Sequence, residues 1–485
     1  MADVVILSGN FFIKEATRNK KEPFSPSKSS QCRALGAYQI AHHLRKHGIT
    51  CQVIDYVQLM NELELISFIR KFLPSDRSLP SILGISRTFF PFKNKKFPPK
   101  ILHIIKTIKG EYPNLKVVVG GASAMYVNQK LNFIDYSISG YAEDVALELF
   151  SGILKKTPLK LEYKLSTKIE RDNTDFNICE SDHRFIREDC IRHGETLPLE
   201  ISRGCIFKCA FCRYRYTGKK KNDYIRDIEE VKNEILYNYK NFGTTNYYIL
   251  DDTFNETPHK VQEFYDMTQS LPFKINYFAY IRADLLHRFP ETAVQLMESG
   301  LTAAIFGIET LGEQSSKLVG KAWSGKHARE FLKELKQNIW KDRVSINTNF
   351  IVGLPPDTLP DLLEMQSYIT SIGIEKLTWH VFSFSSTGDK LSEIEKHPEK
   401  YGFTLFPENK WHNGLYSRDE ANVYYDILTN HPIRPDKISA YSMMECMAFY
   451  DKDTMMKTPF CEFRDDLYKK REIYYSQYLK LLNSL

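Results

Sequence analysis

The chain has 485 residues, of which 42% are hydrophobic and 26% charged, the composition of an ordinary globular protein with room for about three domains. Its formal net charge of +6 is small for this length, so it permits a nucleic-acid partner without arguing for one. The nine cysteines lack the density of a disulfide scaffold and no apolar run approaches a membrane span, which predicts a cytoplasmic protein without a membrane segment.

Residues 1–152 alternate short apolar runs with amphipathic segments, the pattern of a doubly wound, Rossmann-like parallel sheet. The predicted strands and helices, in chain order, are 4–7, 35–44, 51–55, 63–72, 82–86, 101–108 and 117–120. Ligands of such sheets bind beyond the carboxyl ends of the strands. The residues expected at that edge are Ser8, Gly9, Ser86, Arg87, Gly120 and Gly121.

The glycine pair at 120–121, with the stretches 134–136 and 140–143 that follow it, resembles the corresponding part of cobalamin-binding domains. The DxHxxG loop that gives cobalt a histidine ligand in one branch of these proteins is absent. The resemblance therefore implies either a cobalamin that lacks this lower ligand or a domain that has kept the fold and lost the vitamin.

Residues 153–195 are polar and irregular, and we interpret them as a linker with one strand near 159–165. Two lysine-rich runs, over 93–100 and 219–221, are interpreted as solvated loops, although either could contact phosphate groups.

Residues 196–385 repeat a strand and an amphipathic helix, which predicts a parallel, barrel-like sheet. The predicted strands are 199–202, 247–250, 275–280, 304–308, 345–351 and 376–382. Residues 386–485 are rich in aromatic side chains and methionine, and we expect a helical region that caps the barrel and shapes the substrate site.

Three cysteines, Cys205, Cys209 and Cys212, follow the first strand of this second series with the spacing CxxxCxxC. Three thiolates on one loop hold three irons of a four-iron cluster and leave the fourth iron open to a further ligand. A structural zinc site would need a fourth cysteine or histidine at ligand spacing, and residues 213–222 supply none.

The cysteine motif, with Phe211 before its last cysteine, resembles the cluster loop of the radical S-adenosylmethionine (SAM) superfamily. The resemblance implies a partial (β/α)6 barrel and a [4Fe-4S] cluster whose open iron chelates SAM. It also implies a one-electron donor such as flavodoxin or ferredoxin. In this superfamily a cobalamin-binding domain of the kind expected over 1–152 precedes many cores.

Groups at the other predicted strand ends resemble superfamily positions that line the SAM site. Those positions, with the aromatic residue of the loop, are Phe211, Asp251, Asp252, Arg282, Asp284, Glu309, Val352 and Gly353. Asn349 and Asp357 replace the first glycine and the glutamate of the GxIxGxPgE stretch that packs against adenine. For Asp251 and Asp252 a local alternative is a turn or helix cap before Thr253.

The resemblance implies reductive cleavage of SAM to a 5′-deoxyadenosyl radical and, with cobalamin, methylation of an unactivated carbon. With an empty first domain, the same core would catalyse a rearrangement, a cyclisation or a sulfur insertion. A third hypothesis is a non-catalytic iron-sulfur protein that binds nucleic acid through the lysine-rich runs.

Overall fold

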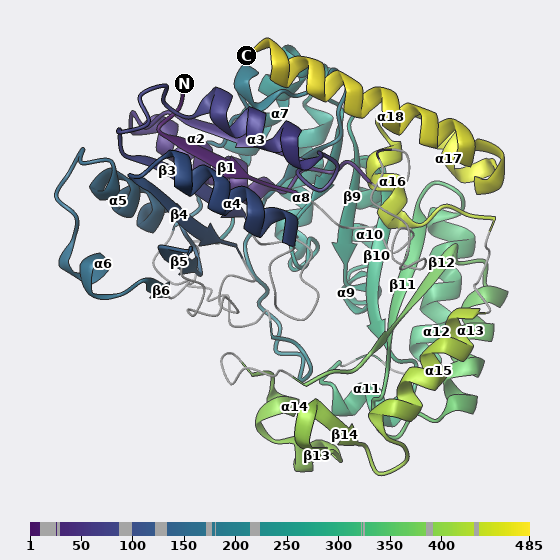
Figure 1. Cartoon of the computed structure of the whole chain (residues 1–485). Coiled ribbons are helices and arrows are strands. Elements are labelled where there is room, and N and C mark those ends of the chain that lie inside the picture. Colours follow the sequence, from purple (N-terminus) through teal and green to yellow (C-terminus); the bar gives the residue numbers. More distant parts are fainter. Residues whose placement is uncertain are drawn as a thin grey trace. The chain divides into compact units, whose positions relative to one another are not determined.

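The structure is a computed structural model that describes residues 1–9, 26, 30–86, 99–121, 133–170, 177–179, 181–213, 224–321, 323, 325–384, 391–430 and 436–485. The chain forms two compact units (Figure 1). The first unit comprises Met1–Pro198, Asn233–Thr244 and Asp466–Leu485, and the second comprises Leu199–Lys232 and Thr245–Asp465. The end of the chain therefore belongs to the first unit, whereas the sequence pattern groups it with a separate closing region.

The first unit contains, within its described residues, a six-stranded sheet of strand order β2-β1-β3-β4-β5-β6. The neighbouring strands pair in parallel, which confirms the predicted doubly wound fold. The strands are β1 (Val4–Leu7), β2 (Cys51–Ile54), β3 (Ser81–Ser86), β4 (Leu115–Gly120), β5 (Tyr136–Ser139) and β6 (Lys168–Glu170). The helices are α2 (Leu35–Lys46), α3 (Glu62–Phe72), α4 (Pro99–Glu111), α5 (Glu143–Ile153) and α6 (Leu161–Leu165).

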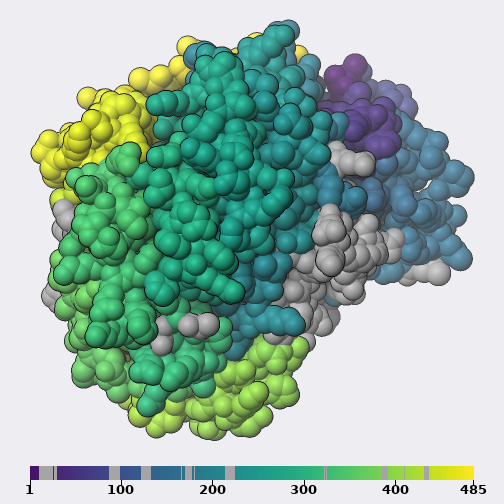
Figure 2. Space-filling model, turned by 180° about the vertical axis from the view of Figure 1, so that it is seen from behind, coloured from purple at the N-terminus to yellow at the C-terminus, as the bar shows by residue number. Residues whose placement is uncertain are grey.

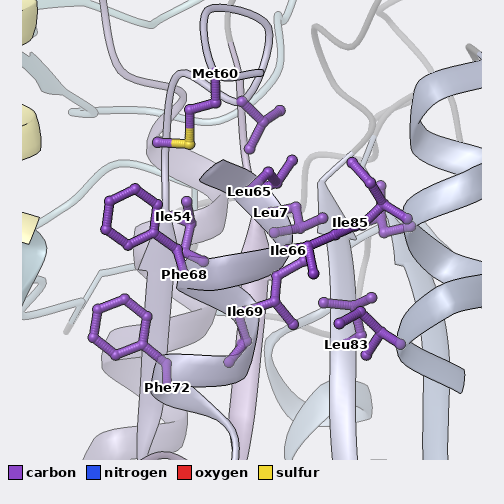
Figure 3. Packing of buried hydrophobic residues seen from close by; sticks show 14 of the residues in the cluster. Leu7, Ile54, Met60, Leu65, Ile66, Phe68, Ile69, Phe72, Leu83 and Ile85 are labelled. Carbon is purple, nitrogen blue, oxygen red and sulfur yellow. The ribbon is translucent and has the colours of Figure 1, made fainter. Parts of the chain in front are cut away.

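The main core of this unit lies between the sheet and the helices α3 and α4 (Figure 3). Leu65 and Ile69 occupy one stripe of α3 because they are four residues apart, and both are fully buried. They pack with Leu7 of β1 and Leu83 of β3 in the same cluster. The final helix α18 (Phe460–Ser484) adds Tyr478 to this cluster, which makes it an integral part of the first unit's core.

The strand predicted near 159–165 is wrong, because this segment forms the short helix α6 and the strand follows it as β6. Leu161 and Leu165 are four residues apart, a spacing that fits a helical turn as well as a strand, so periodicity alone cannot separate the two in so short a run. Tyr163 anchors α6 on α5, where its buried hydroxyl donates to Glu148 Oε2 at 2.6 Å.

A buried ion network joins Arg33, just before α2, to Arg192 and Glu195, just before β7, and links both to α18. Glu195 pairs with Arg33 at 2.6 Å and with Arg192 at 2.8 Å, and all three side chains are at most 1% exposed. Arg192 also donates to the carbonyl oxygen of Tyr474 on α18 at 3.0 Å. Burial alone would raise the pKa of Glu195, but attraction to Arg192 and Arg33 outweighs it and lowers the pKa to about 2.

The second unit is built, over its described residues, on strands β8 to β12 of a six-stranded sheet of order β12-β11-β10-β9-β8-β7, and these strands pair in parallel, whereas β7 is divided between the units. The strands are β7 (Leu197–Leu199), β8 (Asn246–Ile249), β9 (Asn276–Ile281), β10 (Leu301–Glu309), β11 (Ser345–Val352) and β12 (Lys376–Val381). All six match predicted strands, although β7 starts two residues earlier than expected and ends where the predicted strand begins.

Amphipathic helices cover the outer face of this sheet and contribute to the teal and green surface of the unit in Figure 2. They are α8 (Pro258–Gln269), α10 (Glu291–Glu298), α12 (Gly325–Glu334) and α13 (Leu359–Ser371), with α7 (Ile228–Phe242) divided between the two units. The helix expected near Tyr424 is confirmed as α15 (Arg418–Asn430). In the part of the chain that the structure describes, no helix is both long and apolar enough to cross a bilayer.

The buried ion network leads to a first prediction. Replacing Glu195 with Gln leaves two buried arginines without their anion, so we expect the first unit to lose about 3–5 kcal/mol of unfolding free energy at neutral pH. Because the pKa of Glu195 is lowered from 4.5 to about 2, this contribution is present above pH 4.5 and is lost as the pH falls toward 2. Urea unfolding across this pH range measures both effects.

The control for this prediction is Glu111→Gln, which removes an ion pair to the solvent-exposed Arg70. We expect no measurable change in stability from it, because exposed pairs contribute little. An equal loss in both variants, or a loss in Glu195→Gln that does not shrink in acid, would contradict the assignment.

Candidate iron-sulfur and cofactor site

The cysteine loop follows β7 and is held by backbone bonds from two other segments. The amide of Ala210 donates to the carbonyl oxygen of Val319, just beyond helix α11 (Glu313–Leu318), at 3.0 Å. The carbonyl oxygen of Ala210 accepts from Ile394 in helix α14 (Glu393–Lys396), also at 3.0 Å. Segments far apart in the sequence therefore fix the loop that carries Cys205, Cys209 and Cys212.

Two of the three thiols contact polar groups from other strand ends. Arg282, directly after β9, places Nη1 3.3 Å from Cys209 Sγ, and its guanidinium lies 4.0 Å above the ring of Phe207. Thr253, four residues after the end of β8, places its hydroxyl 3.3 Å from Cys205 Sγ. Cysteine sulfurs that bind metal are negatively charged, and hydrogen-bond donors such as Arg282 and Thr253 stabilise that charge.

The donor set fits a four-iron cluster. Cys209 is buried, whereas Cys205 and Cys212 are partly exposed on the same loop. In the described residues, no three Cys, His, Asp or Glu side chains converge as ligands of a single metal ion. Such convergence is needed for a structural zinc ion but not for a cluster, whose cysteines bind different irons. Phe211, which stands between Cys209 and Cys212 in the sequence, is partly buried.

Asp251 braces the loop from within the protein. Its carboxylate is fully buried and accepts from the backbone amides of Ile201 and Ser202 at 2.9 Å each. It also accepts from Lys260 Nζ on α8 at 2.6 Å. These bonds engage both carboxylate oxygens of Asp251 within the protein, while Asp252 lies exposed beside it. The cofactor contacts that the resemblance implies for the two residues stay predictions.

Lys260 is a component of the site that the sequence analysis missed. It is a buried lysine, 2% exposed, that pairs with Asp251 and also with Glu256 at 3.2 Å. The sequence signal was the i, i+4 spacing of Glu256 and Lys260, which occurs on many solvent-exposed helices and therefore did not stand out.

Arg282 and Asp284 form a mutual ion pair, with Nη2 and Oδ2 2.6 Å apart. Burial alone would lower the pKa of Arg282, but its bond to Asp284 outweighs this and raises the pKa well above the ordinary value. Arg282 therefore stays protonated next to Cys209, with Asp284 as its counterion.

Glu309 ends β10 in a conformation that side chains rarely adopt. Its φ is +69°, and the pairing of β10 with β11 shifts register between Gly307 and Glu309. Strained backbone of this kind is concentrated at functional sites. Lys321, which the sequence analysis also missed, donates to the carbonyl oxygen of Gly307 and lies 3.4 Å from Glu309 Oε1. The carboxylate is thus held at the strand end by a buried lysine.

Val352 and Gly353 end β11 and lie under the segment 403–416. Val352 is fully buried, and its carbonyl oxygen accepts from the amide of Phe382 at 2.9 Å. Gly353 has a φ of +118°, and a side chain there would come within 2.8 Å of the ring of Trp411. The carbonyl oxygen of Gly353 accepts from Asn413 Nδ2 at 3.2 Å, so a glycine is required by both conformation and space.

Asp357, which replaces the motif glutamate, is committed to the protein interior. Its carboxylate accepts from the hydroxyls of Thr310 and Ser315 at 2.7 Å each. Burial raises the pKa of Asp357, and the two hydroxyl bonds oppose the shift. These bonds join the end of β10 to the turn after β11.

In the first unit, the predicted cobalamin-edge residues gather where expected. Ser86 and Gly120 are paired partners at the ends of β3 and β4, and Ser8 directly follows Leu7, whose partner is Ile85. Ser8 is fully buried, and no bond to its hydroxyl is present in the described residues. Gly9 continues the same end of β1, Gly121 follows Gly120 with a φ of +97°, and Arg87 lies outside the described residues.

This edge fits a ligand on two counts. An unpartnered buried hydroxyl such as that of Ser8 is uncommon unless something else bonds to it. Among the described residues, a side chain built at Gly120 would meet no atom within 4 Å, so none of them fills the strand end there.

Residues 199–369 match the model of the Radical SAM superfamily. The chain is 21% identical over 261 residues to bacteriochlorophyllide d C-8(2)-methyltransferase of Chlorobaculum tepidum, a match over 52% of this chain and 55% of that protein. It is 25% identical over 260 residues to ribosomal protein uS12 methylthiotransferase RimO of Campylobacter jejuni, over 51% of this chain and 53% of the relative. The matches therefore span little more than half of each relative.

The structure is similar to that of the radical S-adenosylmethionine methyltransferase TsrM from Kitasatospora setae, solved with cobalamin and a [4Fe-4S] cluster bound. The TM-score is 0.59 with 15% identity, over 84% of this chain and 76% of TsrM. At this identity the likeness concerns the fold, and it covers both sheets. Residues 199–369, which carry the cysteine loop at the carboxyl end of a parallel sheet, thus match the Radical SAM superfamily model, and the chain shares the fold of TsrM.

Proposed function

We propose that this chain is a methyltransferase that binds a [4Fe-4S] cluster, SAM and cobalamin, and that it methylates an unactivated carbon. The observation that carries the proposal is the loop of three cysteines at the carboxyl end of a parallel sheet, with Arg282 against Cys209 Sγ. When bound, the cluster would supply the electron that cleaves SAM, and cobalamin would supply the methyl group.

The residues around the loop have complementary roles in this proposal. Cys205, Cys209 and Cys212 would hold three irons, and Arg282 would orient the loop and balance its charge. Glu309, held by Lys321, would accept hydrogen bonds from the ammonium or ribose hydroxyls of SAM. The aromatic residues Trp411 and Phe403, whose rings are 5.5 Å apart, would keep water from the adenine side. A one-electron donor such as flavodoxin or ferredoxin would complete the system.

Support for cobalamin comes from the edge of the first sheet and from the fold. The unpartnered Ser8 hydroxyl and the open position at Gly120 lie at the strand ends where ligands of such sheets bind. TsrM, with a similar fold, was solved with cobalamin.

Methylthio transfer is a second candidate, because RimO is a methylthiotransferase of comparable similarity. The cysteines of the first unit count against a second cluster there: Cys32 and Cys51 are buried, and Cys51 has a pKa that burial raises to about 12. Thiols in this state make poor metal ligands. Binding of cobalamin by the purified chain separates the two candidates.

The cluster assignment predicts the behaviour of Cys209→Ala. After anaerobic iron-sulfur reconstitution, we expect this variant to lose the visible cluster absorbance and the formation of 5′-deoxyadenosine from SAM, because one iron loses its ligand. The matched control is Cys461→Ala, which removes an exposed cysteine on α18 and should keep both signals. Retention of either signal by Cys209→Ala would contradict the assignment.

The role of Glu309 predicts a selective loss of SAM binding. In Glu309→Gln we expect a Kd for SAM that is roughly ten- to a hundredfold higher, because charge-assisted bonds to the cofactor are weakened. The cluster absorbance should not change. Glu313→Gln, four residues away on the exposed side of α11, is the control and should bind SAM normally. Titration calorimetry under anaerobic conditions measures both, and equal affinities would remove Glu309 from the site.

The cobalamin assignment predicts that the vitamin remains with the full chain after desalting and that Gly120→Phe prevents this. A ring at Gly120 would occupy the open strand end. Gly110→Phe, at an exposed position of α4 where a side chain also meets nothing within 4 Å, should retain cobalamin. The visible spectrum reports cobalamin per protein. Absence of the vitamin from the unaltered protein would refute this assignment and leave the cluster assignment standing.

A further inference from the structure

The two faces of the second sheet differ in what they contact. Phe306 of β10 lies 5.6 Å from the ring of Trp340, and Trp379 of β12 donates to Gln366 on α13 at 3.2 Å, so these side chains face the outer helices. Side chains alternate along a strand, and paired residues of neighbouring parallel strands share a face. Asn347 and Asn349 of β11 therefore point to the inner face.

Helix α16 (Ala440–Cys446) packs on the inner face near the start of the strands. The ring of Tyr441 lies 6.2 Å from Phe278 and 6.5 Å from Tyr280 of β9. Asn246, at the start of β8, donates to the carbonyl oxygen of Met447 just after α16 at 2.8 Å. The inner face is thus covered at the amino ends of the strands, while the cysteine loop lies at their carboxyl ends.

Asn347 and Asn349 form an amide pair on this inner face. Asn347 Nδ2 donates to Asn349 Oδ1 at 3.1 Å and to the hydroxyl of Thr378 at 3.2 Å. Across the described part of the chain, Asn347 Oδ1 and Asn349 Nδ2 have no hydrogen-bond partner, although Asn347 is only 1% exposed. The pair therefore presents one acceptor and one donor to the inner side. If the oxygen and nitrogen of both amides were exchanged, the pair would still present one acceptor and one donor.

The strand register places the amide pair just below the cysteine loop. Asn349 is paired with Gly307 of β10. Ile281 of β9 is paired with Phe306, the residue before Gly307, and the residue after Ile281 is Arg282, which contacts Cys209. Asn349 and Arg282 are therefore at the same height on the inner face. A group bound to the amide pair would lie next to the site where the radical would form.

An aromatic cluster lies at the same height on the other side of β10. Tyr280 and Asn347 are both partners of Ile305, so their strands are separated by two strand spacings, about 10 Å. Ile305 itself lies between them on the inner face, with Ala303 beside it, so a bound group would reach both sides across the Ile305 side chain. A planar ring with an attached polar group has the right size to contact both sides.

The charges on this face favour a neutral group at the amide pair. Arg282 is paired with Asp284, and Glu309 with Lys321, so these charges are already balanced. The alternative to a neutral group is an anionic one. The two chemistries can be separated by experiment.

We propose that Asn347 and Asn349 are specificity-determining residues that recognise an amide-type group, with adjacent donor and acceptor, on a planar substrate whose ring packs against Tyr280 and Tyr441. The proposal rests on the proposed radical SAM function, because it assigns the substrate side of that site. A lactam or carboxamide satisfies both free positions of the amide pair at once, whereas a carboxylate offers acceptors only.

The test uses benzamide and benzoate as matched probes of the full chain, reconstituted with the cluster and with SAM bound. Ligand-observed NMR titration gives the Kd of each probe. We expect benzamide to bind the unaltered protein roughly tenfold more tightly than benzoate, since only benzamide fills both positions. Asn347→Leu and Asn349→Leu should each weaken benzamide roughly tenfold, because each removes one bond and leaves the other partner unmatched.

The matched control is Asn338→Leu, which alters an exposed asparagine of the same unit and should bind benzamide normally. Thermal midpoint, cluster absorbance and SAM affinity, measured on every variant, show that fold and cofactor site persist. Benzamide binding that survives both inner-face substitutions, tighter binding of benzoate, or no benzamide binding below about 10 mM would overturn the proposal. Formation of 5′-deoxyadenosine is measured separately, so failure of the radical function is distinguishable from failure of this one.

Discussion

The buried carboxylate of Asp251 is the constraint on which the candidate site depends. It accepts two backbone amides at the start of the cysteine loop and the ammonium of Lys260, with all partners out of water. Removing one partner from such a buried ion pair costs about 3–5 kcal/mol, because the remaining charge is left uncompensated. The loop can therefore be irregular and still hold its cysteines in place.

Buried side chains also join distant segments elsewhere along the carboxyl edge of the second sheet. Asp357 joins the end of β10 to the turn after β11 through two hydroxyls, and Lys321 holds Glu309 at a strained strand end. Gly353 makes room for Trp411 from a segment almost sixty residues further along. Polar groups at these strand ends are thus bonded to residues from distant segments of the same unit.

The first unit uses buried charge for a different purpose. The pairs of Glu195 with Arg33 and Arg192 fasten α18 to segments from the beginning and middle of the chain. The sheet edge that would bind cobalamin therefore belongs to the same unit as residues Asp466–Leu485 of α18. Substitutions in α18 can act on this edge through stability without touching it.

The sequence by itself determined the six strands of the second sheet, four of the six strands of the first and the cysteine loop, because these depend on local periodicity and on a short, specific spacing. Only the tertiary structure decided which acidic groups are bonded within the protein: Asp251 and Asp357 stand at motif positions, and their bonds come from residues 9 to 50 positions away. It also decided the role of Lys260 and Lys321, the place of α18 and the inward direction of Asn347 and Asn349. Burial and pairing across strands fix these features, and neither is encoded in a local pattern.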